Sequence, residues 1–279
     1  MLATAIIVFR EVLEAALIVG VVLAASVGVP RRTWWVGAGI AGGVVGAALV
    51  AAFATSISAM VQGMGQELFN AAILLAAVVM LGWHNVWMGR HGREMAAEMN
   101  NVGAAVRSGR QPLYVLGVVV GIAVLREGSE IVLFLYSIAI TSQNDALGML
   151  AGGVLGLALG VLAGAALYLG LLRIPVRHLF SATSLLITLL AAGMAAQAAN
   201  FLVNAGYLPA LDDQLWNTSW ILADDSLAGR VLHTLLGYVD RPSGIQLLFY
   251  IVTVAAIGGL SRLVMRLPAA PQAPPQPAE

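Results

Sequence analysis

The sequence contains no cysteine and no lysine, and charged residues make up only 10% of its 279 positions. Without cysteine, the chain can form no disulfide, no thiolate metal site and no cysteine nucleophile. All 14 basic residues are arginines that balance 14 acidic residues, so the net charge of zero gives no sign of a nucleic-acid partner, and we expect none. Hydrophobic residues make up 60% of the chain, which indicates an all-α, polytopic membrane protein and excludes an ordinary soluble domain.

Seven apolar segments are long enough to cross a membrane as helices, because a hydrocarbon core of about 30 Å takes about 20 helical residues. They cover residues 3–27, 34–57, 67–88, 114–140, 148–172, 179–203 and 244–265. The first segment carries Arg10 and lacks both a basic start and a small-residue cleavage site. It therefore predicts a retained transmembrane helix and not a signal peptide.

The positions of the arginines predict how these helices are oriented, since cytoplasmic loops carry an excess of Lys and Arg. The connections after the first, third and fifth segments and the end of the seventh are all basic, through Arg31, Arg32, Arg90, Arg93, Arg107, Arg110, Arg173, Arg177, Arg262 and Arg266. The connection 204–243 instead holds five aspartates against two arginines. We therefore expect the N-terminus outside and the C-terminus in the cytoplasm.

Two charged motifs of the form R-E-x-x-E lie inside the apolar segments, where an ionisable side chain costs about 2.5–3.5 kcal/mol. They are Arg10-Glu11-Val12-Leu13-Glu14 and Arg126-Glu127-Gly128-Ser129-Glu130. Residues three or four apart share one face of a helix, so the two glutamates of each motif point the same way. Each motif is expected about 15–20 Å from the membrane surface, near the middle of the bilayer. Ionisable residues at that depth mark a functional site.

The chain also predicts an inverted repeat. Glu67-Leu68-Phe69-Asn70-Ala71 opens the third segment and His178-Leu179-Phe180-Ser181-Ala182 opens the sixth, while segments one and four carry the two motifs. Segments two and five are both rich in glycine, which we expect to serve close helix packing. Three spans in each half are an odd number, so the halves have opposite topology, a recurring design in transporters.

We therefore expect one transmembrane permease domain over residues 1–267, built as an inverted 3+3 repeat plus a seventh helix. Its parts are a first repeat (1–110), a second repeat (111–203), an outer loop (204–243) and the seventh helix (244–265). Residues 268–279 contain five prolines and predict a disordered tail.

If the two motif helices pack together, four carboxylates and two guanidiniums meet, and the cluster carries a net charge of −2. In a medium of low dielectric this charge needs protons or a cation to balance it. Carboxylate oxygens are hard donors that suit hard ions such as Fe³⁺, Mg²⁺ or Mn²⁺. The motifs therefore predict a metal site with four ligands and two arginines that tune their charge: Glu11, Glu14, Glu127 and Glu130, with Arg10 and Arg126.

A few residues outside the motifs also deserve an interpretation. Glu67, Asp212 and Asp213 are candidates for the path by which a cation reaches the site, although helix N-termini and outer loops are often acidic for other reasons. His84, near the inner end of the third segment, is interpreted as an interfacial residue and not as a ligand. Residues 226–238 predict a short amphipathic helix on the membrane surface.

The two motifs and the seven spans together resemble the high-affinity, oxidase-dependent iron permeases of fungi and bacteria. The stretch Asp213-Gln214-Leu215-Trp216-Asn217-Thr218-Ser219-Trp220, followed by Gly237-Tyr238 and Arg241-Pro242-Ser243, is similar to the bacterial branch. The resemblance implies that the motif glutamates are needed to move iron as cargo, with no bound cofactor. It also implies membrane lipid around the chain, a bacterial inner-membrane location and an extracytoplasmic partner: a cupredoxin-like carrier, a peroxidase or a multicopper oxidase that delivers or oxidises iron.

The sequence thus favours a permease, and not an enzyme, that moves an iron ion in the ferric state into the cytoplasm. A first alternative keeps the transporter and changes the cargo to another divalent metal or a proton-coupled organic cation. A second alternative is an intramembrane enzyme or assembly subunit that uses the carboxylates as acid–base groups. The spans lack a nucleophile or a catalytic His–Asp pair, which speaks against this second alternative.

Overall fold

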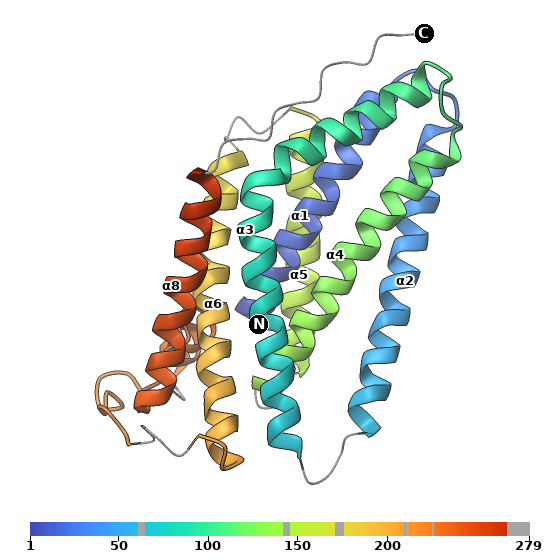
Figure 1. Cartoon of the computed structure of the whole chain (residues 1–279). Helices are drawn as coiled ribbons and strands as arrows, with labels where there is room; N and C mark the ends of the chain where they lie inside the picture. Colours follow the sequence, from blue (N-terminus) through green and yellow to red (C-terminus); the bar gives the residue numbers. More distant parts are fainter. Residues whose placement is uncertain are drawn as a thin grey trace.

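The computed structural model describes residues 1–60, 65–141, 146–170, 176–208, 211, 213–224 and 226–266. Within these residues the chain forms eight helices and no strand (Figure 1). The helices are α1 (Leu2–Ala25), α2 (Arg32–Met60), α3 (Gln66–Arg107), α4 (Tyr114–Thr141), α5 (Ala146–Tyr168), α6 (Val176–Asn204), α7 (Leu227–Leu236) and α8 (Gly244–Arg266). The predicted tail 268–279 and the candidate access residue Asp212 lie outside the described residues.

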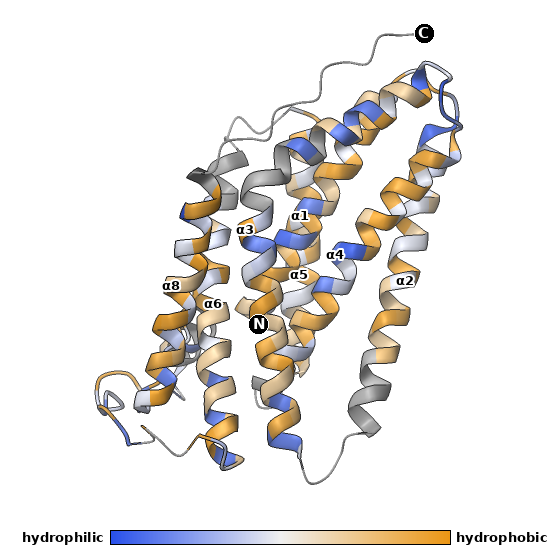
Figure 2. Cartoon of the chain, viewed as in Figure 1, coloured by the Kyte–Doolittle hydropathy of each residue, from blue (hydrophilic) through white to orange (hydrophobic). Residues whose placement is uncertain are grey.

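Five of these helices are long and apolar enough to cross a membrane: α2, α3, α5, α6 and α8. Helices α1 and α4, with 24 and 28 residues, are as long, but each carries the three charged residues of its R-E-x-x-E motif. Figure 2 shows these hydrophilic residues in the middle of otherwise hydrophobic helices. The all-helical, polytopic architecture predicted from composition is therefore consistent with the structure.

Helix α3 is much longer than predicted, with 42 residues instead of the apolar span 67–88. The arginine-containing stretch after residue 88 was expected to be a connection, and the structure shows that most of it is helical. Its Ala, Met, Glu and Arg residues have high helix propensity and it contains no proline, so the helix continues through Gly89 and Gly92 beyond the apolar run. The helix ends at Arg107, directly before Ser108 and a glycine in the left-handed region, Gly109 with φ 75°.

The predicted amphipathic helix in the outer loop is present as α7. Ser226 caps its N-terminus, since its Oγ accepts a hydrogen bond from the Gly229 backbone N–H at 2.9 Å, and Gly237 ends it with φ 68°. The helix does not stand apart from the bundle, because it packs against α6 and α1. The backbones of Gly193 and Gly237 meet so closely that a Cβ on either would lie within 3.0 Å of the other.

Glycine ridges hold the two motif helices against their neighbours. Helix α5 presents its buried glycines, spaced by four residues, to α1, and a Cβ on any of them would lie under 3.0 Å from α1 or from Met1, the residue directly before it: Gly152, Gly156, Gly160 and Gly164. Helix α2 presents Gly39 and Gly43 to α4 in the same way. The predicted packing role of these glycines is confirmed. The close packing pairs α1 with α5 and α4 with α2.

Two apolar clusters enclose the level at which the motifs lie. One cluster contains Ile7 of α1 and Phe134 of α4, together with buried residues of α3, α6 and α8. The other contains Val22 of α1 and Val120 of α4, together with residues of α2 and α3. Both motifs lie between these clusters along their helices, so packed side chains separate the charged level from the two ends of the bundle.

Candidate metal site

The three charged residues of the α1 motif are buried. Arg10 lies 3.2 Å from Glu11 through Nη1 and Oε1, and 3.0 Å from Glu14 through Nη2 and Oε1. The second pair joins residues four apart, as expected for one face of a helix. The side chains of Arg10, Glu11 and Glu14 are at most 3% exposed, so one buried guanidinium pairs with two buried carboxylates.

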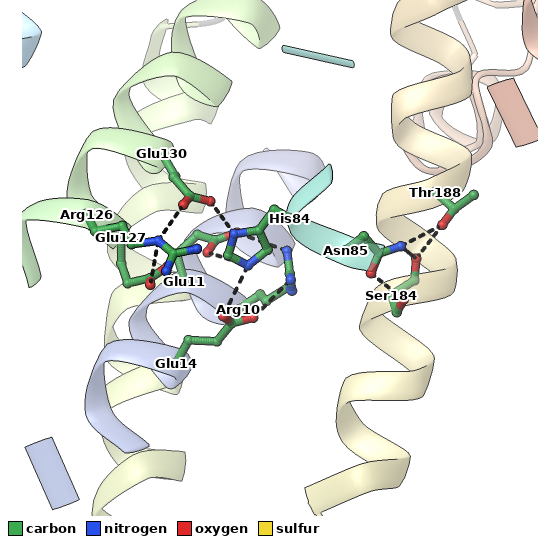
Figure 3. Close-up of polar contacts among 10 residues, drawn as sticks. All are labelled: Arg10, Glu11, Glu14, His84, Asn85, Arg126, Glu127, Glu130, Ser184 and Thr188. Carbon is green, nitrogen blue, oxygen red and sulfur yellow. Dashed lines mark hydrogen bonds and ion pairs between the residues drawn. The ribbon is translucent and has the colours of Figure 1, made fainter. Parts of the chain in front are cut away.

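The motif of α4 faces the same point from the opposite side (Figure 3). Arg126 Nε lies 3.2 Å from Glu130 Oε1 and 3.9 Å from Glu127 Oε1. Its guanidinium carbon also sits 5.0 Å from the ring centroid of Trp87 on α3, a cation–π contact. Unlike Arg10, Arg126 is 38% exposed.

A histidine of α3 joins the two motifs. His84 Nδ1 lies 2.6 Å from Glu130 Oε2 on α4, and His84 Nε2 lies 3.1 Å from Glu14 Oε2 on α1 (Figure 3). The side chain is only 2% exposed, so the interpretation of His84 as an interfacial residue is wrong. The available signal was its position inside an apolar span, since any ionisable residue in such a span is a candidate functional residue.

Four potential ligand atoms converge at this point. One ring nitrogen of His84 and one carboxylate oxygen each from Glu11, Glu127 and Glu130 all lie within 4.8 Å of one another, and all four residues are buried. Opposite ligands of a metal ion bound at about 2.1 Å are about 4.2 Å apart. The four atoms therefore lie close enough together to contact one metal ion.

Two of the converging carboxylates have a buried oxygen that makes no hydrogen bond, and no ion pair shorter than 4.0 Å, to any residue that the structure describes. Among the described residues, Glu11 Oε2 and Glu127 Oε2 are buried and have no hydrogen-bond partner. A buried carboxylate oxygen without a partner loses its hydration and gains nothing in return. Both oxygens are thus suited to bind a cation that enters the cluster.

Glu14, the fourth predicted ligand, lies in the cluster with both oxygens engaged. Its Oε1 forms an ion pair with Arg10 Nη2 at 3.0 Å, and its Oε2 lies at hydrogen-bond distance, 3.1 Å, from His84 Nε2. In this arrangement Glu14 positions the other two side chains, while the four-residue group that could hold an ion contains His84 in its place.

The residue after His84 ties α3 to α6 on the side away from the motifs. Asn85 Nδ2 donates to Thr188 Oγ1 at 3.0 Å and to the Ser184 backbone carbonyl at 3.3 Å. Ser184 Oγ donates in turn to Asn85 Oδ1. These hydrogen bonds fix how α3 is rotated about its axis, because they hold Asn85 toward α6 while His84 points to α1 and α4 (Figure 3).

The candidate access residues lie far from the cluster. Glu67 is in the first turn of α3, and the 17 residues that separate it from His84 correspond to about 26 Å along a helix. It lines a cavity of about 350 Å³ together with residues such as Ala205 and Tyr207. Asp213 is exposed in the connection between α6 and α7. The structure therefore brings the motif glutamates together but leaves Glu67 and Asp213 outside the cluster.

Comparison with known proteins gives consistent matches. The model of the Iron permease FTR1 family matches residues 1–267. A protein named ferrous iron permease EfeU from Yersinia pestis is 33% identical over 251 residues, which cover 88% of each chain. Proteins of the same name from Escherichia coli O6:H1 and Shigella sonnei are 33% identical over 242 residues, covering 85% of this chain and 87% of theirs. No solved structure matches the chain.

Proposed function

The chain belongs to the iron permease FTR1 family, and on this premise we propose that iron crosses the membrane through the cluster where α1, α3 and α4 meet. Relatives of the chain are named permeases, so it is a transporter of iron and not an enzyme. The observation that supports this path is the convergence of Glu11, Glu127 and Glu130 with His84 at one buried point. The five strongly apolar helices make the chain an integral membrane protein.

We propose that the ion in this site is Fe²⁺. The resemblance and the hard carboxylate donors favoured ferric iron, but the relatives are named ferrous iron permeases. The charges of the cluster favour a divalent ion as well. Four glutamates and two arginines sum to −2 when ionised, which one Fe²⁺ beside a neutral imidazole balances, whereas Fe³⁺ leaves a charge of +1.

We propose that the membrane domain consists of two inverted three-helix repeats followed by α8 as the seventh span, with the N-terminus outside. Helix contacts support the repeat. Helix α1 packs along α5 of the other half, α4 packs along α2, and the corresponding helices α1 and α4, and α3 and α6, also touch. This is the exchange of partners that a pseudo-two-fold axis between inverted halves generates.

In this orientation the two arginines lie on opposite sides of the ion. Helices α1 and α4 run in opposite directions, so Arg10 lies on the outer side of the glutamates and Arg126 lies on their cytoplasmic side. Arg126 is the more exposed of the two, and an exposed arginine at mid-membrane depth needs a polar environment. We propose that the ion arrives past Asp213 and Glu67 and leaves the site beside Arg126.

The setting of the permease follows from the same premise. We propose a bacterial inner-membrane location and an extracytoplasmic protein that hands iron to the outer loop, since α7 and its flanking turns form a folded surface there. A cupredoxin-like carrier, a peroxidase or a multicopper oxidase remains the predicted class of partner.

Radiolabelled iron uptake into vesicles tests the proposed function. The full chain is reconstituted in liposomes with external ⁵⁵Fe²⁺ kept reduced by ascorbate, and the wild type is compared with Glu127→Gln. The control is Glu98→Gln, which changes an exposed glutamate of α3 outside the cluster. We expect uptake in the wild type and the control and none in Glu127→Gln. Equal uptake by all three, or stronger uptake of Mn²⁺ than of Fe²⁺ by the wild type, would reject the proposed path or cargo.

A further inference from the structure

Three helices meet at the cluster, but only two of them carry the repeated motif. The third, α3, contributes a single nitrogen donor among oxygen donors. Resting on the function proposed above, we propose that His84 is a direct ligand of the transported ion and determines the selectivity of the site for Fe²⁺ over harder divalent cations such as Mn²⁺ and Mg²⁺.

The position of the imidazole supports direct ligation. Its ring nitrogens lie 2.6 Å from Glu130 Oε2 and 3.1 Å from Glu14 Oε2, so the ring lies between the two motifs. Ligation through one nitrogen replaces the contact of that nitrogen with a carboxylate, while the other nitrogen keeps its own. One of these nitrogens belongs to the group of ligand atoms within 4.8 Å of one another. An ion that binds the oxygens of Glu11 and Glu127 in this group therefore has the ring beside it.

The donor chemistry gives this residue a role that the glutamates cannot fill. Carboxylate oxygens suit Mg²⁺, Ca²⁺ and Mn²⁺, whereas imidazole nitrogen suits iron, zinc, nickel and copper. For a given site, affinity rises from Mn²⁺ to Fe²⁺. Three carboxylates alone would hold the harder ions well, and a nitrogen ligand shifts the preference toward Fe²⁺.

The repeat shows that this nitrogen is an addition to a symmetric carboxylate site. In the register that aligns Glu67 with His178, the position of His84 in the second half is occupied by Ala195, which is buried in α6. The carboxylates are thus supplied twice and the imidazole once. The asymmetry is what a selectivity residue added to a general cation site would produce.

Asn85 acts as the positioning residue for His84. Its hydrogen bonds to Ser184 and Thr188 hold the adjacent turn of α3 on α6. A ligand whose orientation is fixed by neighbouring hydrogen bonds binds its metal more tightly, and loss of such a partner typically reduces metal affinity about 10–100-fold.

A purely structural role makes a different prediction. If His84 only bridges Glu14 and Glu130 by hydrogen bonds, a glutamine can replace it in that bridge, and the ion would be bound by oxygen alone. If His84 is a ligand, the X-ray absorption spectrum of the bound iron must contain scattering from an imidazole ring.

X-ray absorption at the iron edge distinguishes the two roles on the purified full chain loaded with one equivalent of Fe²⁺. An imidazole ligand gives a characteristic scattering pattern from the outer ring atoms. The chain has four histidines, so His84→Gln is compared with a variant in which the other three, His91, His178 and His233, are all changed to Gln. We expect the imidazole pattern in the wild type and in the triple variant, and its loss in His84→Gln.

Uptake selectivity supplies the second readout. In liposomes, the ratio of Fe²⁺ to Mn²⁺ uptake should fall about tenfold in His84→Gln, because Mn²⁺ depends less on the nitrogen, and it should stay at the wild-type value in His233→Gln. An oxygen-only iron shell in the wild type would overturn the proposal without any variant, as would an unchanged ratio in His84→Gln. Either result with intact iron uptake leaves the permease function standing, whereas absence of wild-type uptake removes that function itself.

Discussion

The two R-E-x-x-E motifs share a pattern of five residues but not an environment. In α1, Arg10 is 3% exposed and lies within 3.2 Å of both glutamates of its motif. In α4, Arg126 is 38% exposed, lies near Glu130 and leaves Glu127 at 3.9 Å, while its guanidinium also covers Trp87. The first motif is sealed, with its arginine in contact with both glutamates, whereas the second is open at Arg126. Glu11 and Glu127 each retain a buried oxygen without a hydrogen bond among the described residues. One sequence pattern thus serves two roles.

The residues between the charges contribute to this difference. The α1 motif has Val12 and Leu13 at its variable positions, and Val12 packs on Gly160 of α5. The α4 motif has Gly128 and Ser129, and Gly128 meets Ala47 of α2 so closely that no Cβ would fit. The first motif thus packs a large residue on a glycine of α5, while the second packs its own glycine on α2.

The largest expected effect is on Fe²⁺ uptake, and it should differ between replacing Glu127, which has a free oxygen, and replacing Glu14, whose oxygens contact Arg10 and His84. Glu127→Gln should reduce Fe²⁺ uptake about 100-fold, because it replaces a charged carboxylate ligand by a neutral amide. Glu14→Gln should reduce uptake only about tenfold, because Glu14 acts through Arg10 and His84. Initial uptake rates in liposomes, normalised to protein inserted, measure both. Equal losses would mean that the two glutamates have the same role.

The next effect concerns stability. Arg10→Gln should destabilise the fold by about 3–5 kcal/mol, since it leaves two buried carboxylates without their counter-charge. Arg126→Gln should cost about 1 kcal/mol, because its ion pairs are partly exposed. Thermal unfolding in detergent, followed by the loss of monodisperse protein, ranks the two variants. A variant of Arg126 that unfolds earlier than the Arg10 variant contradicts the sealed and open assignment.

Packing beneath the sealed motif gives a smaller effect. Gly160→Ala places a Cβ 2.8 Å from Val12 and should destabilise the chain by about 1–3 kcal/mol through overpacking. Gly42→Ala is the matched control, because no atom outside its own helix lies within 4 Å of the added Cβ. That substitution should stabilise slightly through helix propensity. If both substitutions changed the unfolding temperature in the same direction in the thermal unfolding assay, the packing role of Gly160 would be contradicted.

The smallest effect tests the open motif. Trp87→Leu removes the cation–π contact and should cost about 0.5–1 kcal/mol. The loss should disappear when Arg126 is already replaced by Gln, since the two side chains act as a pair. A double-mutant cycle on unfolding temperatures measures this coupling, and additive losses would show that Trp87 acts independently of Arg126.

Much of the charged site could be predicted from the sequence because helical spacing is local. A spacing of three or four residues is enough to put Glu11 beside Glu14. The glycines of α5, spaced by four residues, predict close packing against another helix. The length of α3 does not follow from hydropathy, because the apolar run ends before the helix does. Hydropathy marks a span that ends at residue 88, while residues of high helix propensity continue to Arg107.

His84 and the inequality of the arginines depend on contacts between helices that no local pattern contains. His84 meets residues 70 positions earlier and 46 positions later in the chain, so its partners follow only from how α3 is rotated. Asn85 and its hydrogen bonds to α6 set that rotation. The exposure of Arg126 likewise depends on where α2 and α3 leave α4 uncovered.

The shared site is tested most directly by the number of ferrous ions that the purified chain binds at equilibrium. We predict one Fe²⁺ per chain, and its loss on replacing either Glu11 or Glu127 by glutamine, because both motifs contribute to a single ion. Two ions per chain, with one remaining after either substitution, would mean that each motif binds its own metal and would contradict the account.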